Sequence, residues 1–169
     1  MATEKKICGY HGTDKEYGDA IFQTKIFLPS QSDAEWLGKG VYFYIKSDDA
    51  AEWCKKRNYD NPMILRACVI VKEDEYLDYD TEDGKGLIRS AMEVITHASK
   101  YTKFGENNAA AKNQHAIAMV LWAEFPELKV LLGTFPTQAH PFPVIKDVRP
   151  LRPEFCVRDS SYLREIEIC

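Results

Sequence analysis

The order of apolar segments along the chain constrains its fold more than any other feature of the sequence. Segments of the strand type, rich in β-branched and aromatic residues, occupy both ends of the chain, at 6–10, 41–45, 63–71, 76–80, 129–135, 155–157 and 162–168. Apolar residues at helical spacing predict short helices at 14–24 and 47–57 and longer ones at 86–103 and 107–125. Strands on either side of a helical middle, without a repeating strand–helix–strand unit, indicate an α+β fold.

A single domain spanning residues 1–169 is expected. The 169 residues contain no repeat, no low-complexity tract and no linker, and 45% of them are hydrophobic. A chain of this length buries roughly 70% of its unfolded surface, so it needs neither a disulfide nor a metal ion to fold.

Charge and hydropathy exclude several classes of protein. The net charge of −4 lacks the basic surplus of most nucleic-acid-binding domains, although a local basic patch would suffice for such binding. The first residues, MATEKKICGY, do not form a signal peptide, and no apolar stretch approaches the roughly 20 residues of a membrane span. We therefore expect a cytoplasmic protein with no membrane partner. A protein delivered by a specialised secretion machine would have the same sequence features.

The cysteines and histidines do not predict a metal site. None of the five cysteines forms a CxxC pair, and the four histidines lack metal-ligand spacing. Cys68 and Cys156 lie in apolar strands and are interpreted as small buried hydrophobic residues.

Three clusters contain residues that could take part in binding or catalysis. The first is Gly9-Tyr10-His11-Gly12-Thr13, at the end of the first predicted strand. The glycine after His11 lets the backbone approach a ligand closely. A histidine that ends a strand more often only satisfies a hydrogen bond.

The second cluster is Gly38-Lys39-Gly40-Val41-Tyr42-Phe43-Tyr44, followed by a helix that Ser47 caps. Tyr42 and Tyr44 share one face of a strand. Ala50 and Trp53 share one face of the helix, where a small residue beside a large ring makes a slot for a flat ligand. The alternative is that the glycines only form a turn and the aromatic rings only fill the core. The segment is not a phosphate loop, because GxxxxGK[ST] is absent.

The third cluster is Pro153-Glu154-Phe155-Cys156-Val157, in which Glu154 opens an apolar strand. A carboxylate at the end of a strand beside a pocket suggests chemistry, whereas most such glutamates are simply solvated.

Together the clusters resemble the three signature segments of ADP-ribosyltransferases of the diphtheria-toxin and poly-ADP-ribose polymerase type. That family has a segment reading GKGIYF, where this chain reads GKGVYF, and a Tyr-Cys pair further on, where this chain has Trp53-Cys54. Its third segment begins with Glu-Tyr-Ile-Val, where this chain reads Glu-Phe-Cys-Val from Glu154. The resemblance covers residues 7–57 and 150–168 and implies a split β-sandwich with flanking helices and a helical insert in the middle.

The resemblance also implies roles for individual residues. His11, Tyr42 and Glu154 would form the catalytic triad, in which Glu154 binds the 2′-hydroxyl of the nicotinamide ribose. His11 would contact the adenosine ribose, the Gly12 backbone the nicotinamide carboxamide, and Tyr42 and Trp53 the two faces of the nicotinamide ring. The implied NAD+-binding set is His11, Gly12, Thr13, Tyr42, Ala50 and Trp53.

One departure from the family concerns Ala50, which stands where the family often has a serine hydroxyl on the nicotinamide amide. The loss of one such hydrogen bond costs about 0.5–1.5 kcal/mol of binding.

The implied reaction explains why these residue types are needed. Loss of nicotinamide leaves oxocarbenium-like positive charge on the ribose, which a nearby carboxylate stabilises. Aromatic faces hold the cationic nicotinamide ring. NAD+ is thus expected as the substrate, with no metal.

We expect mono-transfer of ADP-ribose to a protein or nucleic-acid acceptor, by a small toxin or defence protein that an antitoxin or inhibitor would control. The alternatives are an NAD+ glycohydrolase and a non-catalytic module that binds NAD+, ADP-ribose or a protein. The two middle helices either recognise the acceptor or, as we favour, complete the core. Basic residues near the second and third clusters are candidates for a phosphate-binding groove: Lys39, Lys46, Lys55, Lys56, Arg57, Lys146, Arg149 and Arg152.

Overall fold

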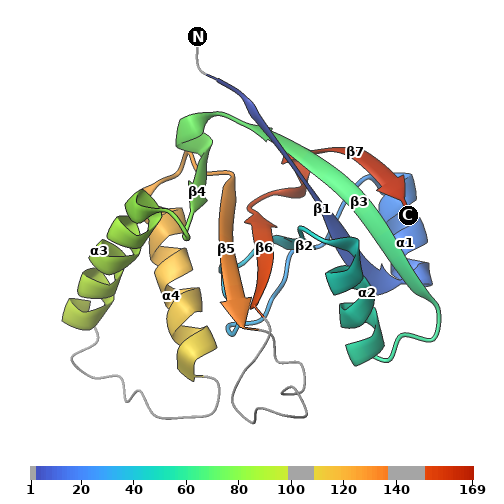
Figure 1. The fold of residues 1–169 in the computed structure, drawn as a ribbon, viewed down its shortest axis with the longest axis horizontal. Coiled ribbons are helices and arrows are strands. Elements are labelled where there is room, and N and C mark those ends of the chain that lie inside the picture. Colours follow the sequence, from blue (N-terminus) through green and yellow to red (C-terminus); the bar gives the residue numbers. More distant parts are fainter. Residues whose placement is uncertain (1–2, 99–108, 137–150) are drawn as a thin grey trace.

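The computed structural model describes residues 3–98, 109–136 and 151–169, and this part of the chain forms one mixed sheet with four α-helices (Figure 1). The strands are β1 (Lys5–Asp14), β2 (Val41–Tyr44), β3 (Pro62–Val71), β4 (Tyr76–Asp78), β5 (Val130–Pro136), β6 (Leu151–Val157) and β7 (Leu163–Ile168). The helices are α1 (Lys15–Thr24), α2 (Ser47–Lys56), α3 (Glu82–Ala98) and α4 (Ala109–Glu124). The predicted α+β class is confirmed. Part of the predicted helix at 86–103, from 99 on, lies outside the described residues.

The seven strands lie in the order β4-β5-β6-β2-β1-β3-β7, and only the β4–β5 pair is parallel. The longest pairing joins β1 to β3, from Lys5 opposite Val71 to Asp14 opposite Pro62. In contrast, β1 pairs with β2 only where Tyr10 lies opposite Tyr44. The sheet therefore has two halves joined by a narrow junction, and Figure 1 shows β1 and β3 running obliquely to β5 and β6.

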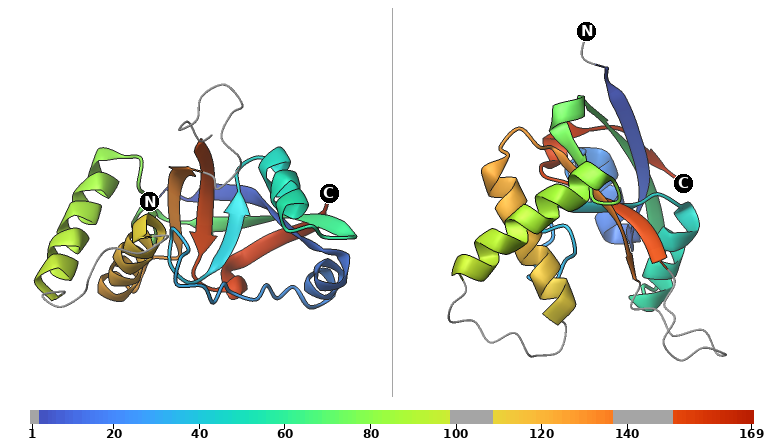
Figure 2. Two further views of the ribbon diagram at one scale, coloured as in Figure 1. Left: turned by 90° about the horizontal axis from the view of Figure 1, so that it is seen from below. Right: turned by 60° about the vertical axis from the view of Figure 1, so that its left-hand side comes forward.

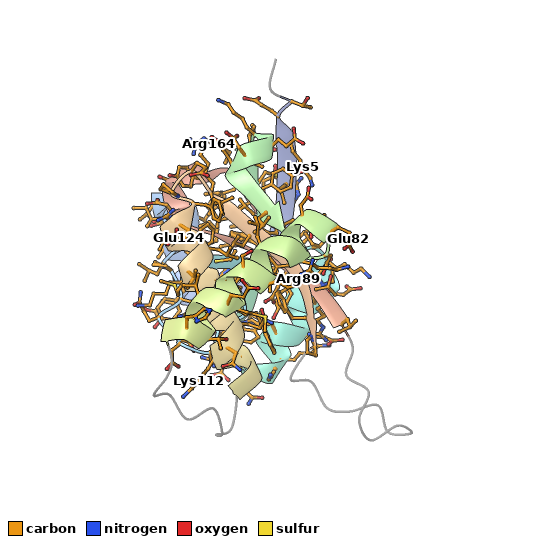
Figure 3. The ribbon with its side chains drawn as sticks, turned by 90° about the vertical axis from the view of Figure 1, so that its left-hand side faces the viewer. Lys5, Glu82, Arg89, Lys112, Glu124 and Arg164 are labelled. Carbon is orange, nitrogen blue, oxygen red and sulfur yellow. A yellow bond between two sulfur atoms is a disulfide. The ribbon has the colours of Figure 1, made fainter. Side chains whose placement is uncertain are left out.

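The helices lie in two groups at opposite ends of the sheet, α1 with α2 beside β1 and β3, and α3 with α4 beside β4 and β5 (Figures 1 and 2). Figure 3 looks onto the second group, where α3 lies in front and carries the exposed side chains of Glu82 and Arg89. None of the helices in the described residues is long and apolar enough to cross a membrane.

Two apolar cores flank the sheet. The first lies on the face to which β2 turns Val41 and Phe43, and includes Ile21, Phe27, Leu65, Val69 and Phe155. The second lies between the α3–α4 pair and the other face of β5 and β6, and includes Leu37, Ile117, Leu121, Trp122, Leu131 and Cys156. The two middle helices thus complete a core, as favoured above, and they cover part of the face on which Tyr42 lies.

Two predicted element ends are wrong because strand pairing overrides local signals. His11 does not end a strand, since β1 continues along β3 as far as Asp14, whose side chain then caps α1. Glu154 does not open a strand, since β6 begins at Leu151 and passes through Pro153 alongside β5. Proline is tolerated there because it lies at the end of the β2–β6 pairing, where Ile45, one residue past β2, donates to the Pro153 carbonyl at 3.2 Å and the missing Pro153 N–H falls outside the paired residues.

Two further details differ from expectation. Ser47 is the first residue of α2 and not its cap, and Lys46 at the cap position makes no side-chain hydrogen bond. Cys68 is buried as predicted, but it forms a disulfide with Cys8, which lies directly opposite it on β1. The prediction that Cys156 is a small buried residue is confirmed, and the structure shows that its thiol is free.

Candidate active site

A pocket of about 840 Å³ brings the three sequence clusters together. The predicted residues that line it are His11, Gly12 and Thr13 from β1, Tyr42 from β2, Trp53 from α2 and Glu154 from β6. Ala50 does not line it within the described part of the chain, because that side chain is fully buried.

Strand register explains why Glu154 faces the tyrosines. Tyr44 lies directly opposite Glu154 in the antiparallel β2–β6 pair, and directly opposed residues project to the same face. Alternation along β2 then puts Tyr42 on that face, while Val41 and Phe43 enter the first core.

His11 is held as a neutral ring. Its Nδ1 lies 2.9 Å from the backbone carbonyl of Tyr42, and a carbonyl only accepts, so Nδ1 carries the proton and Nε2 can accept. Burial lowers the pKa of His11, and the bond to Tyr42 opposes this only in part. Phe27 and Phe43 pack against the ring, with centroids 5.3 and 5.7 Å away.

Tyr42 is fixed by the turn that precedes it. Its hydroxyl donates to the Gly38 carbonyl at 2.6 Å and accepts from the Leu37 amide at 2.9 Å. Burial raises the pKa of Tyr42, so the phenol stays neutral. Gly38 has φ +77°, which confirms the predicted glycine turn, and the Trp122 indole of α4 donates to the Leu37 carbonyl at 3.0 Å. The helical middle of the chain therefore supports the wall of the pocket.

Close packing of α2 on β1 sets the opposite wall. A Cβ on Gly12 would lie 2.6 Å from the Ala50 carbonyl and 2.7 Å from the Cys54 sulfur, so a glycine is required for this approach. Ala50 and Cys54 are the buried residues of α2, which leaves Trp53 partly exposed beside the pocket. The Arg57 guanidinium lies 5.5 Å from the centroid of the Trp53 ring.

Glu154 has a strongly perturbed pKa. Burial, followed by the nearby negative charge of Glu35, raises its pKa to about 8. Among the described residues no group donates a hydrogen bond to it or pairs with it. The group is therefore largely protonated at neutral pH, and a cation placed beside it would favour its ionised form.

This pKa predicts a pH-dependent stability. The folded protein keeps the Glu154 proton up to about pH 8, whereas the unfolded chain releases it near pH 4.5, so wild type loses stability as pH rises between these values. Glu154→Gln lacks this loss, and the gap in unfolding free energy between the two proteins should grow by up to roughly 4 kcal/mol from pH 5 to pH 9. Urea unfolding at several pH values measures it, and parallel pH profiles for the two proteins would contradict the raised pKa.

The predicted basic groove is realised only in part. Lys55 and Lys56 line the pocket, and Arg57 lies over Trp53. Arg152 also lines it, but its guanidinium pairs with Asp49 at 3.0 Å and with Glu52. Lys39 and Lys46 are exposed and do not line the described pocket, and Lys146 and Arg149 lie outside the described residues.

Sequence reasoning missed part of the pocket. Glu35, Trp36 and Phe135 line it, and the Trp36 and Phe135 rings stack with centroids 5.2 Å apart. The only signal in the sequence is a tryptophan two residues before the glycine turn. In the described residues no three His, Cys, Asp or Glu side chains are grouped so that they could hold a metal ion.

Comparisons with known proteins identify one relative without a described activity. An uncharacterized protein of Methanocaldococcus jannaschii is 41% identical over 101 residues, which are 56% of this chain and 47% of that protein. The chain thus spans about half of the length of the curated relative it matches. No family model and no solved structure matches the chain.

Proposed function

We propose that the protein is an NAD+-dependent ADP-ribosyltransferase that cleaves the nicotinamide–ribose bond and transfers one ADP-ribose to a macromolecule. The observation that carries the proposal is that three segments distant in sequence line one pocket, with His11, Tyr42, Trp53 and Glu154 among its lining residues. These are the residue types, in the same chain order, that the resemblance requires. The narrow junction between β1 and β2 supports the finer proposal that the sheet is a split β-sandwich.

In the proposed binding mode, NAD+ contacts groups whose protonation and position are set by their contacts within the protein. The unprotonated Nε2 of His11 would accept a hydrogen bond from a ribose hydroxyl. Tyr42 and Trp53 would stack on the nicotinamide ring, while the Gly12 backbone meets its carboxamide. Trp53 already attracts one cation, Arg57, which supports a cationic ring as its ligand.

The proposed chemistry centres on Glu154. The C1′–N bond of the ribose breaks, its electron pair leaves with neutral nicotinamide, and C1′ acquires oxocarbenium character. An ionised Glu154 would bind the 2′-hydroxyl and stabilise this positive charge. The positive nicotinamide ring would lower the pKa of Glu154 on binding, because an opposite charge favours the carboxylate.

The test uses NAD+ labelled on its adenylate half, incubated with the purified protein in cell lysate. We expect nicotinamide to be released and the label to move onto a macromolecule, which protease or nuclease digestion then identifies as protein or nucleic acid. Free ADP-ribose as the sole labelled product would instead mean an NAD+ glycohydrolase. Binding of NAD+ with no nicotinamide release would favour a binding module.

A further inference from the structure

The order of strands divides the pocket into two halves on either side of Glu154. From α2 and β1 the sheet passes through β2 to β6, which carries Glu154, and then to β5. The donor half is lined by His11, Gly12 and Trp53, which the proposed function assigns to NAD+. The acceptor half, beyond Glu154, is lined by Phe135 of β5 together with Glu35 and Trp36 of the loop before β2.

The acceptor half has an aromatic wall built beside Glu154. Gly133 lies directly opposite Glu154 in the β5–β6 pair, and a Cβ on Gly133 would lie 2.7 Å from the Phe135 ring. The missing side chain therefore lets the Phe135 ring lie over β5 next to Glu154. Trp36 stacks on this ring with an angle of 10° between the planes. Phe135 is buried and Trp36 is partly exposed, so Trp36 is the ring available to a ligand.

The same half is acidic. Glu35 and Glu154 both line it, and their mutual repulsion contributes to the raised pKa of Glu154. The hydroxyl of Ser30 donates to one oxygen of Glu35 at 2.7 Å, which orients the carboxylate, and within the described ranges no side chain is bonded to the other oxygen. The basic side chains of the described pocket do not offset these carboxylates. Lys55 and Lys56 belong to α2, in the donor half, and the charge of Arg152 is neutralised by its ion pairs with Asp49 and Glu52.

A flat cation is the ligand that an aromatic ring and two carboxylates recognise best. A guanidinium group stacks on aromatic faces and donates paired hydrogen bonds to carboxylates. A nucleic acid is disfavoured, because its phosphates need basic side chains, and Arg152, which β6 places opposite Phe135, already pairs with Asp49 and Glu52. Resting on the proposed function, we propose that the acceptor is the guanidinium group of a protein arginine, stacked on Trp36 and hydrogen-bonded to Glu35.

This assignment gives Glu35 a role in the transfer. A guanidinium is protonated at all physiological pH values, so its nitrogen attacks only if a proton is removed. The Nη–C1′ bond forms as the C1′–nicotinamide bond breaks, nicotinamide leaves with the bonding electron pair, and the Nη proton passes to the Glu35 carboxylate. The products are neutral nicotinamide, a protonated Glu35 and an ADP-ribosylated guanidinium that carries the one remaining positive charge, so atoms and charge balance.

The experiment measures two products separately, released nicotinamide and the ADP-ribose adduct. The purified protein is incubated with NAD+ and an N-acetylated arginine peptide, the same peptide with lysine in place of arginine, or single-stranded DNA and RNA oligonucleotides. Mass spectrometry identifies the adduct and also maps the modified residue in lysate proteins. We expect the arginine peptide to be modified roughly tenfold or more above the other probes, and arginine to carry the label in lysate.

Variants test the site itself. Trp36→Ala and Glu35→Gln should lower the ratio of adduct to free ADP-ribose roughly tenfold, a ratio that general loss of folding would not change. The matched controls Tyr17→Ala and Glu127→Gln, both exposed and outside the pocket lining, should leave it unchanged. Modification of lysine, another residue or an oligonucleotide, or an unchanged ratio in both variants, would overturn the guanidinium site. Nicotinamide release without any adduct would overturn that site alone, whereas no release with any probe would overturn the proposed function together with it.

Discussion

Replacement of Glu154 by glutamine is expected to slow nicotinamide release from NAD+ by about 10²–10³-fold while NAD+ binding changes little. The variant keeps the size and polarity of the side chain but removes the negative charge that faces the developing oxocarbenium. The oxocarbenium charge develops only in the transition state, so loss of the carboxylate should lower kcat. The dissociation constant of NAD+ should change much less, because the attraction between the carboxylate and the nicotinamide cation is largely offset by the cost of ionising Glu154, whose pKa is about 8. Since the described residues provide no hydrogen bond to Glu154, the substitution should also leave the fold intact.

The measurement combines the rate of nicotinamide release with calorimetric titration of NAD+. Glu167→Gln is a matched control, because Glu167 lies on β7 at the far edge of the sheet and pairs with Arg66 at 3.3 Å. That control should retain wild-type turnover. Full activity in Glu154→Gln would refute the assignment of the third segment, and Glu165 would be the next glutamate to test.

Replacement of Trp53 by alanine is expected to raise the KM for NAD+ about tenfold or more. Stacking and cation–π contacts with an aromatic ring contribute about 1–3 kcal/mol, and every 1.4 kcal/mol changes affinity tenfold. Trp53 is partly exposed, whereas Ala50 and Cys54 hold α2 against β1, so the loss should fall on binding more than on folding.

Steady-state kinetics over a range of NAD+ concentrations measure this change. Trp53→Phe should recover most of the affinity because it keeps a flat face, and Arg57→Ala separates the effect of the ring from that of the guanidinium above it. A KM that stays at the wild-type value in Trp53→Ala would remove Trp53 from the nicotinamide slot. A higher KM in Arg57→Ala alone would indicate that the cation, and not the ring, contacts NAD+.

Much of the local structure is predictable because it depends on neighbours in the chain. The alternation in 41–45 predicts which side chains of β2 face the core. The glycine at position 38 predicts a turn, because glycine readily adopts the positive φ that the structure shows there. The helices α1 and α2 begin and end near the predicted residues. The errors fall where pairing with a distant strand decides the outcome, as when β1 continues past His11 along β3 and when Cys8 meets Cys68.

The sequence by itself determined the α+β class and the composition of the donor half of the pocket, because residue periodicity and three short segments carry that information. It could not show that Ala50 is buried beneath Gly12, since this depends on how closely α2 packs on β1. Only the tertiary structure shows which residues form the acceptor half of the pocket. Glu35, Trp36 and Phe135 meet beside Glu154 because β5 pairs with β6 and α4 holds the loop at Leu37, and contacts between elements so far apart in the chain leave no local pattern in the sequence.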